Sequence, residues 1–337
     1  MNQDGDLTRR MLPEIETELH LILDSFPSDW YSEIAEMIAY HLGWDGEESG
    51  ARGKRVRPLL TLLTCAAAGG DWRQALPAAA AIELIHNFSL VHDDIQDRSD
   101  TRRGRPTVWK RWGIAQAINT GDALFVAAHQ AASRLTSRSV PPHTVLAVRD
   151  RLDHACLRLT HGQHLDLAFE QSPIVTESAY LEMVAGKTAA LLEGATAAGS
   201  LIADAPAPRV AQFAGFGLHL GLAFQILDDI LGIWGEPSVT GKPSGDDLIQ
   251  RKKSLPVLKG LGASPEFAKL WAGGDLTATG LEQMRQALQE SGVLDETRHA
   301  AEEHTSLALA ALEAAQPEPA AGRELRALSD SLLQRSR

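Results

Sequence analysis

Two pairs of aspartates within apolar segments are the residues of this sequence best suited to chemistry. Asp93 and Asp94 are followed by Asp97, and the second pair is Asp228 and Asp229. Because carboxylates are almost never buried without a partner, two acidic motifs in apolar surroundings predict a shared cation. On a helix of 3.6 residues per turn, Asp93 and Asp97 lie about 40° apart on one face. A few carboxylate oxygens open to water and to a substrate phosphate are the ligands that Mg2+ prefers, so the sequence predicts a magnesium site.

Clusters of basic residues complement the acidic motifs. Lys54, Arg55 and Arg57 precede an apolar segment, and Arg102 and Arg103 follow the first acidic motif. Further cations are Lys187, Lys242, Lys252 and Lys253. Guanidinium and ammonium groups bind phosphate oxygens. Acidic pairs for a metal, together with these basic residues, predict a pocket for two diphosphates, one held through the metal and one held directly by side chains.

The composition excludes several classes of protein. Of the 337 residues, 44% are hydrophobic, which is enough for a sizeable core, and the net charge of −12 argues against a nucleic-acid-binding surface. No long apolar run or signal-like N-terminus indicates a membrane span or export. Cys65 and Cys156 are the only cysteines, and they support neither a disulfide framework nor a structural zinc site. We therefore expect a cytoplasmic enzyme.

Stretches without proline indicate the elements that must position these residues. Four such stretches, rich in Ala, Leu, Glu and Gln, are bounded by prolines at 77 and 106, 142 and 173, 173 and 206, and 208 and 237. Their composition and the lack of β-branched alternation predict long helices and an all-α fold. Each acidic motif is expected toward the C-terminal end of its helix. We also expect a loop around residues 315–319 before a last helix, and mobile residues at 1–6.

In this order, the motifs resemble those of the trans-isoprenyl diphosphate synthases, also called polyprenyl synthetases, and among them the bacterial geranylgeranyl diphosphate synthases. The match runs from about Gly53 to Pro256. Its motifs are Gly-Lys-Arg-x-Arg-Pro from Gly53, Asp-Asp-x-x-Asp from Asp93 with Arg102-Arg103, Gly121-Asp122, Gly162-Gln163, Lys187-Thr188, Gln225 with Asp228-Asp229, the segment at Lys242, and Lys252-Lys253. The resemblance implies a single all-α domain over residues 1–337, with long antiparallel helices around a central cavity, the acidic motifs facing each other at its mouth, and usually a homodimer.

The resemblance also implies a reaction. Mg2+ ions held by Asp93, Asp97 and Asp228 assist the departure of diphosphate from an allylic diphosphate. The double bond of isopentenyl diphosphate then attacks the carbocation, and a proton leaves.

Individual residues take roles from the family pattern. Those on the allylic side are Arg102, Lys187, Thr188, Gln225, Lys242 and Lys252, and those on the isopentenyl diphosphate side are Lys54, Arg57, His86 and Arg103. Of these, Lys187 and Lys242 are expected to be catalytic together with the three aspartates. His86 lies seven residues before Asp93, which places it two turns away on nearly the same face of a helix. Lys253 remains an alternative to its neighbour Lys252.

The second acidic motif departs from the family pattern. Gly232 stands where many members carry a third aspartate, so the motif offers two carboxylates instead of three. Asp229 points about 100° away from Asp228 on an ideal helix, and we expect it to act around the metal site and not on the metal. If Asp228 suffices, Gly232→Asp should change the rate little.

Two residues before the first motif bear on product length. In the family, the residues four and five before the first aspartate help to set the cavity floor, and here they are Ser89 and Phe88. Helix geometry favours Ser89, about 40° from Asp93, whereas the family pattern assigns the stop to an aromatic such as Phe88. A small Ser beside one bulky Phe predicts a deeper cavity than two aromatics would. We therefore expect geranylgeranyl diphosphate (C20), with farnesyl diphosphate (C15) as the alternative.

Two other classes of function stay open. A class I terpene cyclase would share the helical fold and a metal motif, but it would have no use for the second diphosphate site formed by Lys54, Arg57 and Arg103. A non-catalytic subunit of a heteromeric synthase is the other alternative. Such subunits generally lose the first acidic motif, which is complete here.

Overall fold

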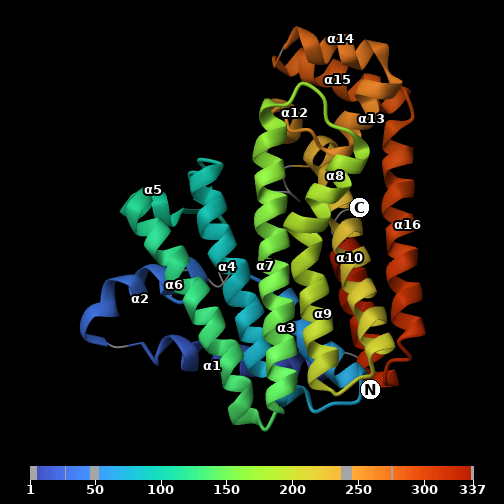
Figure 1. Ribbon diagram of the computed structural model, residues 1–337. Helices are drawn as coiled ribbons and strands as arrows, with labels where there is room; N and C mark the ends of the chain where they lie inside the picture. The colour runs from blue at the N-terminus through green and yellow to red at the C-terminus, as the bar shows by residue number, and fades with distance from the viewer. Residues whose placement is uncertain (1–5, 27, 46–52, 237–244, 275, 335–337) are drawn as a thin grey trace. The chain divides into compact units, whose positions relative to one another are not determined.

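The fold is described from a computed structural model, which describes residues 6–26, 28–45, 53–236, 245–274 and 276–334. Nearly all regular structure in these ranges is helical (Figure 1), and the exception is one hairpin of two short strands. The predicted all-α class is therefore confirmed. Of the residues expected to be mobile, 1–5 lie outside the described residues, and Asp6 begins helix α1 (Asp6–Leu23).

Contacts between Cα atoms divide the chain into two compact units. Unit 1 consists of Met1–Asp153, Ala195–Val210 and Pro317–Leu325, and unit 2 consists of His154–Gly194, Ala211–Gln316 and Arg326–Arg337. The single domain over residues 1–337 stays a prediction.

Unit 1 is built around two helices that lie side by side (Figure 1). Besides α1, its elements are α2 (Ser28–Leu42), α3 (Val56–Ala67), the 3-10 turn η2 (Trp72–Ala75), α4 (Leu76–Gln96), β1 (Thr101–Arg102), β2 (Arg105–Pro106), α5 (Val108–Trp112), α6 (Ile114–Ser133) and the 3-10 turn η3 (Arg134–Arg138). The central helices α4 and α6 make extensive contact. Four successive alanines of α4 from Ala78 and four alanines of α6 between Ala127 and Ala132 are buried, and such small side chains let helix backbones approach closely.

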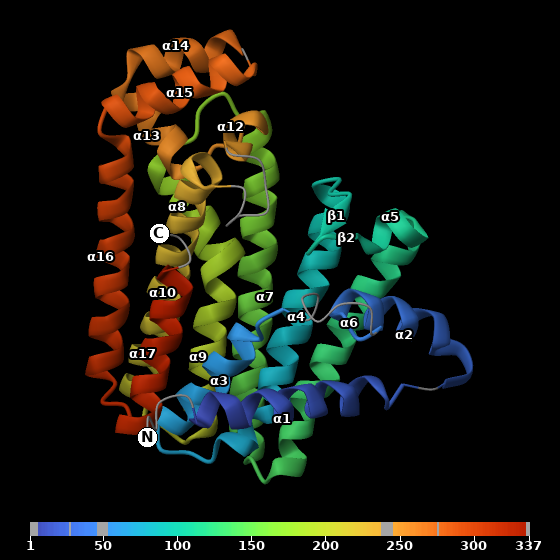
Figure 2. The same ribbon diagram turned by 180° about the vertical axis from the view of Figure 1, so that it is seen from behind.

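The first acidic motif lies at the end of α4, as predicted. Asp97 caps the helix and donates its backbone N–H to the carbonyl oxygen of Asp93 at 2.8 Å. Arg98 then takes a left-handed conformation with φ of 52°, which ends the helix. The rest of the stretch up to Pro106 is not helical. Instead, β1 and β2 form an antiparallel hairpin beyond the C-terminal end of α4 (Figure 2).

Unit 2 contains most of the C-terminal helices. Its elements are the second part of α7 (Pro142–Gln171), α8 (Glu177–Val184), the π-helical turn η4 (Ala185–Ala189), most of α10 (Ala207–Trp234), α12 (Asp246–Ile249), α13 (Leu255–Ala263), α14 (Pro265–Gly273), α15 (Ala278–Glu290) and α16 (Val293–Ala314); α9 (Ala190–Ile202) and α17 (Pro319–Gln334) belong in part to each unit. The predicted loop before a last helix is confirmed between α16 and α17. The second acidic motif lies toward the end of α10, also as predicted.

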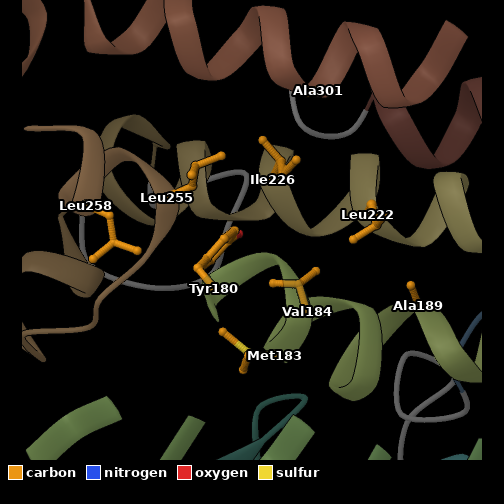
Figure 3. Packing of buried hydrophobic residues seen from close by; sticks show 9 residues of the cluster. All are labelled: Tyr180, Met183, Val184, Ala189, Leu222, Ile226, Leu255, Leu258 and Ala301. Carbon is orange, nitrogen blue, oxygen red and sulfur yellow. The ribbon is translucent and has the colours of Figure 1, made fainter. Parts of the chain in front are cut away.

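Apolar side chains fix α8 against α10 and α13 in unit 2. Tyr180 and Val184 of α8 face Ile226 of α10 and Leu255 of α13, with Ala301 of α16 beside them (Figure 3). Full burial of a side chain of this size contributes roughly 1.5–3 kcal/mol. The resulting rigid contact holds the hydroxyl of Tyr180 next to the second acidic motif.

Helix α10 is long and apolar enough, by length and composition alone, to cross a membrane. Such a run was not expected from the sequence. However, 56% of its most apolar window is buried inside the protein, and its last turns carry Asp228 and Asp229. Both features fit a core helix.

Candidate active site

The first acidic motif separates into one buried and two more accessible carboxylates. Asp94 is 1% exposed, whereas Asp93 is half-buried and Asp97 is exposed. Arg102 donates to Asp94 from Nε at 2.9 and 3.0 Å, and its Nη2 lies 2.8 Å from Oδ1. Burial raises the pKa of Asp94, and Arg102 opposes that shift. Asp93 and Asp97, one turn apart, are therefore the carboxylates of this motif that a dissolved cation can reach.

The hairpin after α4 sets the position of Arg103. Arg103 and Gly104 form its two-residue loop, with φ of 52° and 76°. Positive φ at both loop residues defines the type I′ turn that suits tight hairpins. A Cβ atom built on Gly53 would lie 3.1 Å from Nη2 of Arg103, so the guanidinium rests against the Gly53 backbone. This contact brings Arg103 next to the loop that carries Lys54.

Arg55, in the middle of the basic motif, anchors that loop. It is 3% exposed, with a left-handed φ of 50°, and it forms ion pairs with Glu16 at 2.6 Å and Glu83 at 2.8 Å. Lys54 before it is exposed. The motif therefore uses one cation for structure and presents Lys54 and Arg57 on either side of it.

Arg57 and His86 meet beside this loop. Nη1 of Arg57 lies 3.2 Å from Nε2 of His86. A guanidinium can only donate, so Nε2 accepts and a neutral ring carries its proton on Nδ1. Burial lowers the pKa of His86 well below its usual value, and the charges of Arg57, Arg103 and Arg102 lower it further. Nε of Arg57 is buried and makes no hydrogen bond among the described residues. These cations around a neutral histidine are suited to an anion.

We call this group the α4 site. It comprises Lys54, Arg57, His86, Asp93, Asp94, Asp97, Arg102 and Arg103, all in unit 1. The sequence prediction assigned Arg102 to a substrate diphosphate, and in this structure its guanidinium binds Asp94. Sequence reasoning missed His41, which lines a small pocket together with Asp94, Arg102 and Arg103.

The predicted chain-length residues differ in their contacts. The ring of Phe88 lies 5.1 Å from that of Phe125 on α6 and 5.4 Å from that of His92. Ser89 is buried and donates its hydroxyl to the carbonyl oxygen of His86 at 2.8 Å, within its own helix. Phe125 was not anticipated, because only the packing of α6 on α4 brings it to Phe88.

The second acidic motif also has one buried member. Asp229 is 1% exposed, whereas Asp228 is exposed. Asp229 accepts hydrogen bonds from the hydroxyl of Tyr180 at 2.6 Å, Nε2 of Gln225 at 3.0 Å and the backbone N–H of Leu255 at 3.1 Å. The expectation that Asp229 acts around the metal site agrees with this geometry. Asp228 is the carboxylate of this motif that a cation can reach.

Lys187 and Thr188 lie in the π-helical turn. Lys187 contacts Asp166 at 2.5 Å, and Thr188 donates to Oε1 of Gln225 at 2.8 Å. The turn packs directly against α7, because Cβ atoms on Gly162 and Gly186 would overlap backbone atoms of the other segment. π-turns are frequent at functional sites. Here the turn links Lys187 to the Gln225–Asp229 pair.

The structure distinguishes the two neighbouring lysines. Nζ of Lys253 donates to the carbonyl oxygens of Phe169 and Glu170 at the end of α7. Nζ of Lys252 lies 3.8 Å from Asp229. Burial alone would lower the pKa of Lys252, but the nearby carboxylates raise it above its usual value. Lys252 is therefore the lysine that belongs with the acidic motif.

We call the second group the α10 site. It comprises Lys187, Thr188, Gln225, Asp228, Asp229 and Lys252, all in unit 2. Lys242, predicted to act with them, lies outside the described residues. Sequence reasoning missed Tyr180 and Asp166, for which no motif spacing gave a signal.

The accessible carboxylates fit a hard divalent cation held jointly with a diphosphate. Among the described residues, no group of three or more His, Cys, Asp or Glu side chains is arranged to hold a metal on its own. Mg2+ is usually bound through one or two carboxylates, substrate phosphates and waters, and Asp93 with Asp97 offers such a pair. The donor set therefore matches the predicted metal.

Known proteins resemble this chain over most of its length. A family model described as polyprenyl synthetase matches residues 47–289. A geranylgeranyl diphosphate synthase of Mycobacterium tuberculosis is 40% identical over 340 residues, covering 98% of this chain and 95% of that protein. A (2E,6E)-farnesyl diphosphate synthase of Mycobacterium bovis is 42% identical over 262 residues, covering 75% and 72%.

A solved structure shows the same likeness. Geranylgeranyl pyrophosphate synthase from Corynebacterium glutamicum, complexed with isoprenyl diphosphate and magnesium, has a TM-score of 0.84 and 25% identity, and the match covers 99% of this chain and 100% of that one. Taken with the motifs on α4 and α10, these matches establish that the chain belongs to the polyprenyl synthetase family.

Proposed function

We propose that this protein condenses isopentenyl diphosphate with an allylic diphosphate and that its main product is geranylgeranyl diphosphate. Family membership makes it a trans-prenyltransferase. The observation that carries the proposal is the cationic part of the α4 site. Arg103 rests against Gly53 beside Lys54, and Arg57 contacts His86, so a second diphosphate has its own site without a metal. A cyclase acting on one diphosphate would not need it.

The α4 site would bind isopentenyl diphosphate through Lys54, Arg57 and Arg103. Arg57 and Arg103 are half-buried, and guanidinium groups give strong, directional hydrogen bonds to phosphate oxygens. Neutral His86 accepts from Arg57 and so holds the guanidinium in orientation. The bound substrate would thus present its double bond in a fixed direction, which lowers the entropy cost of condensation.

The α10 site would bind the allylic diphosphate. Lys187, Lys252 and, outside the described residues, Lys242 supply positive charge for the leaving group, and Thr188 with Gln225 supplies polar contacts. In this structure Lys187 pairs with Asp166. The oxygens of an incoming diphosphate would replace the carboxylate of Asp166 as the partner of Lys187. Positive charge placed where the leaving group becomes negative is a major source of rate enhancement.

Divalent metal dependence follows from the family, as the magnesium-bound relative illustrates. We propose that the metal is Mg2+, with Asp93 and Asp97 as ligands in unit 1 and Asp228 as a ligand in unit 2. When bound, Mg2+ neutralises charge on the departing diphosphate. Asp94 and Asp229 hold no metal in this proposal, because each is buried and already bonded to neighbouring side chains.

The C20 product is favoured over C15 for two reasons. The Mycobacterium tuberculosis relative named for geranylgeranyl diphosphate matches almost the full length of both chains, whereas the one named for farnesyl diphosphate matches about three quarters. On α4, the ring of Phe88 contacts that of Phe125, and the next residue is the small Ser89. A substrate cavity bounded in this way would be deeper than one bounded by two adjacent aromatic residues.

We also propose a homodimer in the cytoplasm. Three large apolar side chains of α6, those of Ile114, Ile118 and Val126, are 54%, 43% and 53% exposed and lie within about 120° of arc. Exposed apolar side chains on one side of a helix are suited to contact with another chain. Both cysteines are buried and neither forms a disulfide, as suits a reducing compartment. Light scattering of Ile118→Asp against wild type tests the dimer.

One incubation tests the activity. Purified protein is mixed with isopentenyl diphosphate, Mg2+ and either dimethylallyl, geranyl or farnesyl diphosphate, and products are identified by mass spectrometry. We expect C20 diphosphate from each primer. A cyclised hydrocarbon formed without isopentenyl diphosphate would point to a cyclase. Absence of turnover with every primer would point to a non-catalytic subunit.

A further inference from the structure

One side of helix α7 contacts the π-helical turn at three successive positions. Arg158, Gly162 and Asp166 are spaced four residues apart, so they lie on one face of the helix. Asp166 contacts Lys187 at 2.5 Å, and Gly162 packs against the backbone of Gly186 and Lys187. These two contacts concern the middle of the turn. Arg158 contacts its beginning and the helix that follows it.

The guanidinium of Arg158 joins the turn to helix α9. Its Nη2 donates to the carbonyl oxygen of Ala185, the first residue of the turn, at 3.3 Å. Its Nη1 forms an ion pair with Glu193, which lies on α9 shortly after the turn ends. The backbone of Arg158 also touches the turn, because a Cβ atom built on Gly186 would lie 2.5 Å from its carbonyl oxygen. One residue of α7 therefore holds both ends of the turn.

A π-helical turn needs this kind of support. Such turns are rare, occur mostly as single turns within α-helices, and are frequent at functional sites. A hydrogen bond from a charged donor is stronger than one from a neutral donor, so Arg158 gives the carbonyl of Ala185 a strong partner. The planar fork of a guanidinium can also serve two acceptors at once, whereas the ammonium of a lysine is a single point charge. Arginine is therefore well suited to this position.

The ion pair contributes little to the stability of the whole protein. The side chains of Arg158 and Glu193 are 30% and 22% exposed. Ion pairs that water can reach are weak, because solvent screens the charges and ordering the side chains costs entropy. The contacts of Arg158 are therefore better explained by a local effect on the turn than by stabilisation of the fold.

We infer that Arg158 is a positioning residue of the α10 site, which keeps the π-helical turn formed so that Lys187 and Thr188 can meet the allylic diphosphate. The inference rests on the proposed function and deepens it. Arg158 itself would touch no substrate. Its effect would pass through the turn to Lys187 and, through the hydrogen bond from Thr188, to Gln225.

The test uses three variants and one control. Arg158→Ala removes both contacts of the guanidinium, Arg158→Lys keeps the charge without the fork, and Glu193→Gln removes the ion pair but leaves the donor to Ala185. Arg151→Ala, at an exposed site on the same helix, is the control. Arg158→Lys and Glu193→Gln are the milder changes, and they carry the test if Arg158→Ala does not fold.

Three measurements are made on each protein. Hydrogen–deuterium exchange of residues 181–194 reports on the turn. Calorimetry gives the affinity for geranyl thiolodiphosphate, an allylic analogue that resists ionisation. Steady-state kinetics give KM for the allylic substrate and for isopentenyl diphosphate.

We expect Arg158→Ala to speed exchange in residues 181–194 and to weaken binding of the analogue by about tenfold or more, since a hydrogen bond to a charged group is typically worth that factor. The allylic KM should rise by a similar factor, and KM for isopentenyl diphosphate should stay within about twofold of wild type, whereas a general defect of the fold would raise both. Arg158→Lys and Glu193→Gln should show smaller effects of the same kind. Arg151→Ala should behave as wild type.

Three results would overturn the inference: unchanged exchange of residues 181–194 in Arg158→Ala, wild-type affinity for the analogue in that variant, or equal changes in the two KM values. A wild-type protein that binds the analogue but never condenses an allylic substrate with isopentenyl diphosphate would overturn the proposed function instead. Exchange and calorimetry would then still decide the role of Arg158.

Discussion

Arg102 and Asp94 form a two-pronged ion pair, with Nε and Nη2 of the guanidinium 2.8 to 3.0 Å from the carboxylate oxygens. The pair joins the end of α4 to strand β1. It therefore fixes the hairpin whose loop carries Arg103, and it couples the acidic motif to the cationic part of the α4 site.

The first prediction concerns this pair. Asp94→Asn should destabilise the fold by roughly 1–3 kcal/mol, because the half-buried guanidinium of Arg102 loses its charged partner. The larger effect should be on substrate binding, because the hairpin that positions Arg103 loses its contact with α4. We expect KM for isopentenyl diphosphate to rise by about tenfold with a smaller change in KM for the allylic substrate, a factor worth about 1.4 kcal/mol of binding. Steady-state kinetics measure the two KM values, and urea denaturation measures the stability. Equal changes in the two KM values would contradict the predicted link between Asp94 and Arg103.

Asp93→Ala should abolish most turnover. Removing one preorganised electrostatic contact typically costs about 10²–10³ in rate, and a lost metal should cost more. Asp97→Ala should behave alike, since the two carboxylates lie one turn apart. Chelation of wild type should stop the reaction, and excess Mg2+ should restore it. A rate within about threefold of wild type in Asp93→Ala would remove this residue from the metal site.

Lysine substitutions should separate the two substrates. Lys54→Ala should mainly raise KM for isopentenyl diphosphate, and Lys187→Ala should mainly affect the allylic substrate, because the residues belong to different sites. Lys253→Ala is the matched control, since its ammonium contacts backbone carbonyls at the end of α7. Initial rates with each substrate varied in turn provide the measurement. Parallel effects of Lys54→Ala and Lys187→Ala on both substrates would show that the assignment is wrong.

Product length should depend on the two rings that meet between α4 and α6. Phe88→Ala should lengthen the product by one or more five-carbon units, because the growing chain loses its steric stop, and Phe125→Ala should do so to a smaller extent. Phe26→Ala is the control, since that ring packs on Tyr31. Mass spectrometry of the products gives the answer. An unchanged product length in Phe88→Ala, with turnover intact, would show that another helix provides the steric stop.

Acid should destabilise the protein through two half-buried histidines, His41 and His86. Burial and the charges of Arg103 and Arg102 lower the pKa of His41 to about 3, and the pKa of His86 is also depressed. The unfolded chain therefore binds more protons as pH falls below about 6.5, so stability decreases from there toward pH 3. Each histidine contributes up to about 1.4 kcal/mol per pH unit. Urea denaturation between pH 6.5 and 5 should show this slope. His41→Asn should flatten it, and His143→Asn, at an exposed site, should not.

Helix positions were predictable because they depend on local signals. Proline spacing located α4, α7 and α10, and the 3.6-residue period placed Asp93 and Asp97 on one face and Asp229 away from Asp228. The same period places Asp94 about 100° away from Asp93, on another face of the helix. The Arg103-Gly104 pair could have signalled the hairpin, since glycine favours the positive φ of its turn.

The remaining features depend on contacts between distant segments. Phe125 meets Phe88 because alanines let α6 approach α4, and no spacing in either helix encodes that meeting. Asp247 reaches Gly232 through the shared packing of Leu248 and Ile233. Tyr180 finds Asp229 only when α8 packs on α10. Local periodicity carries no information on which partner a buried side chain will find.

The π-helical turn at Ala185–Ala189 has a consequence for comparing sequences. Such a turn holds one residue more than an α-helical turn, so the helix after it is out of phase by about 100° with the helix before it. A helical wheel drawn across α8 and α9 as one helix would assign the wrong faces to one of them. A relative with one residue fewer at this point could keep an uninterrupted helix, but its equivalent of Lys187 would then point in another direction. A single-residue gap in an alignment at this turn therefore marks a change in the direction of the lysine side chain, even where the lysine itself is kept.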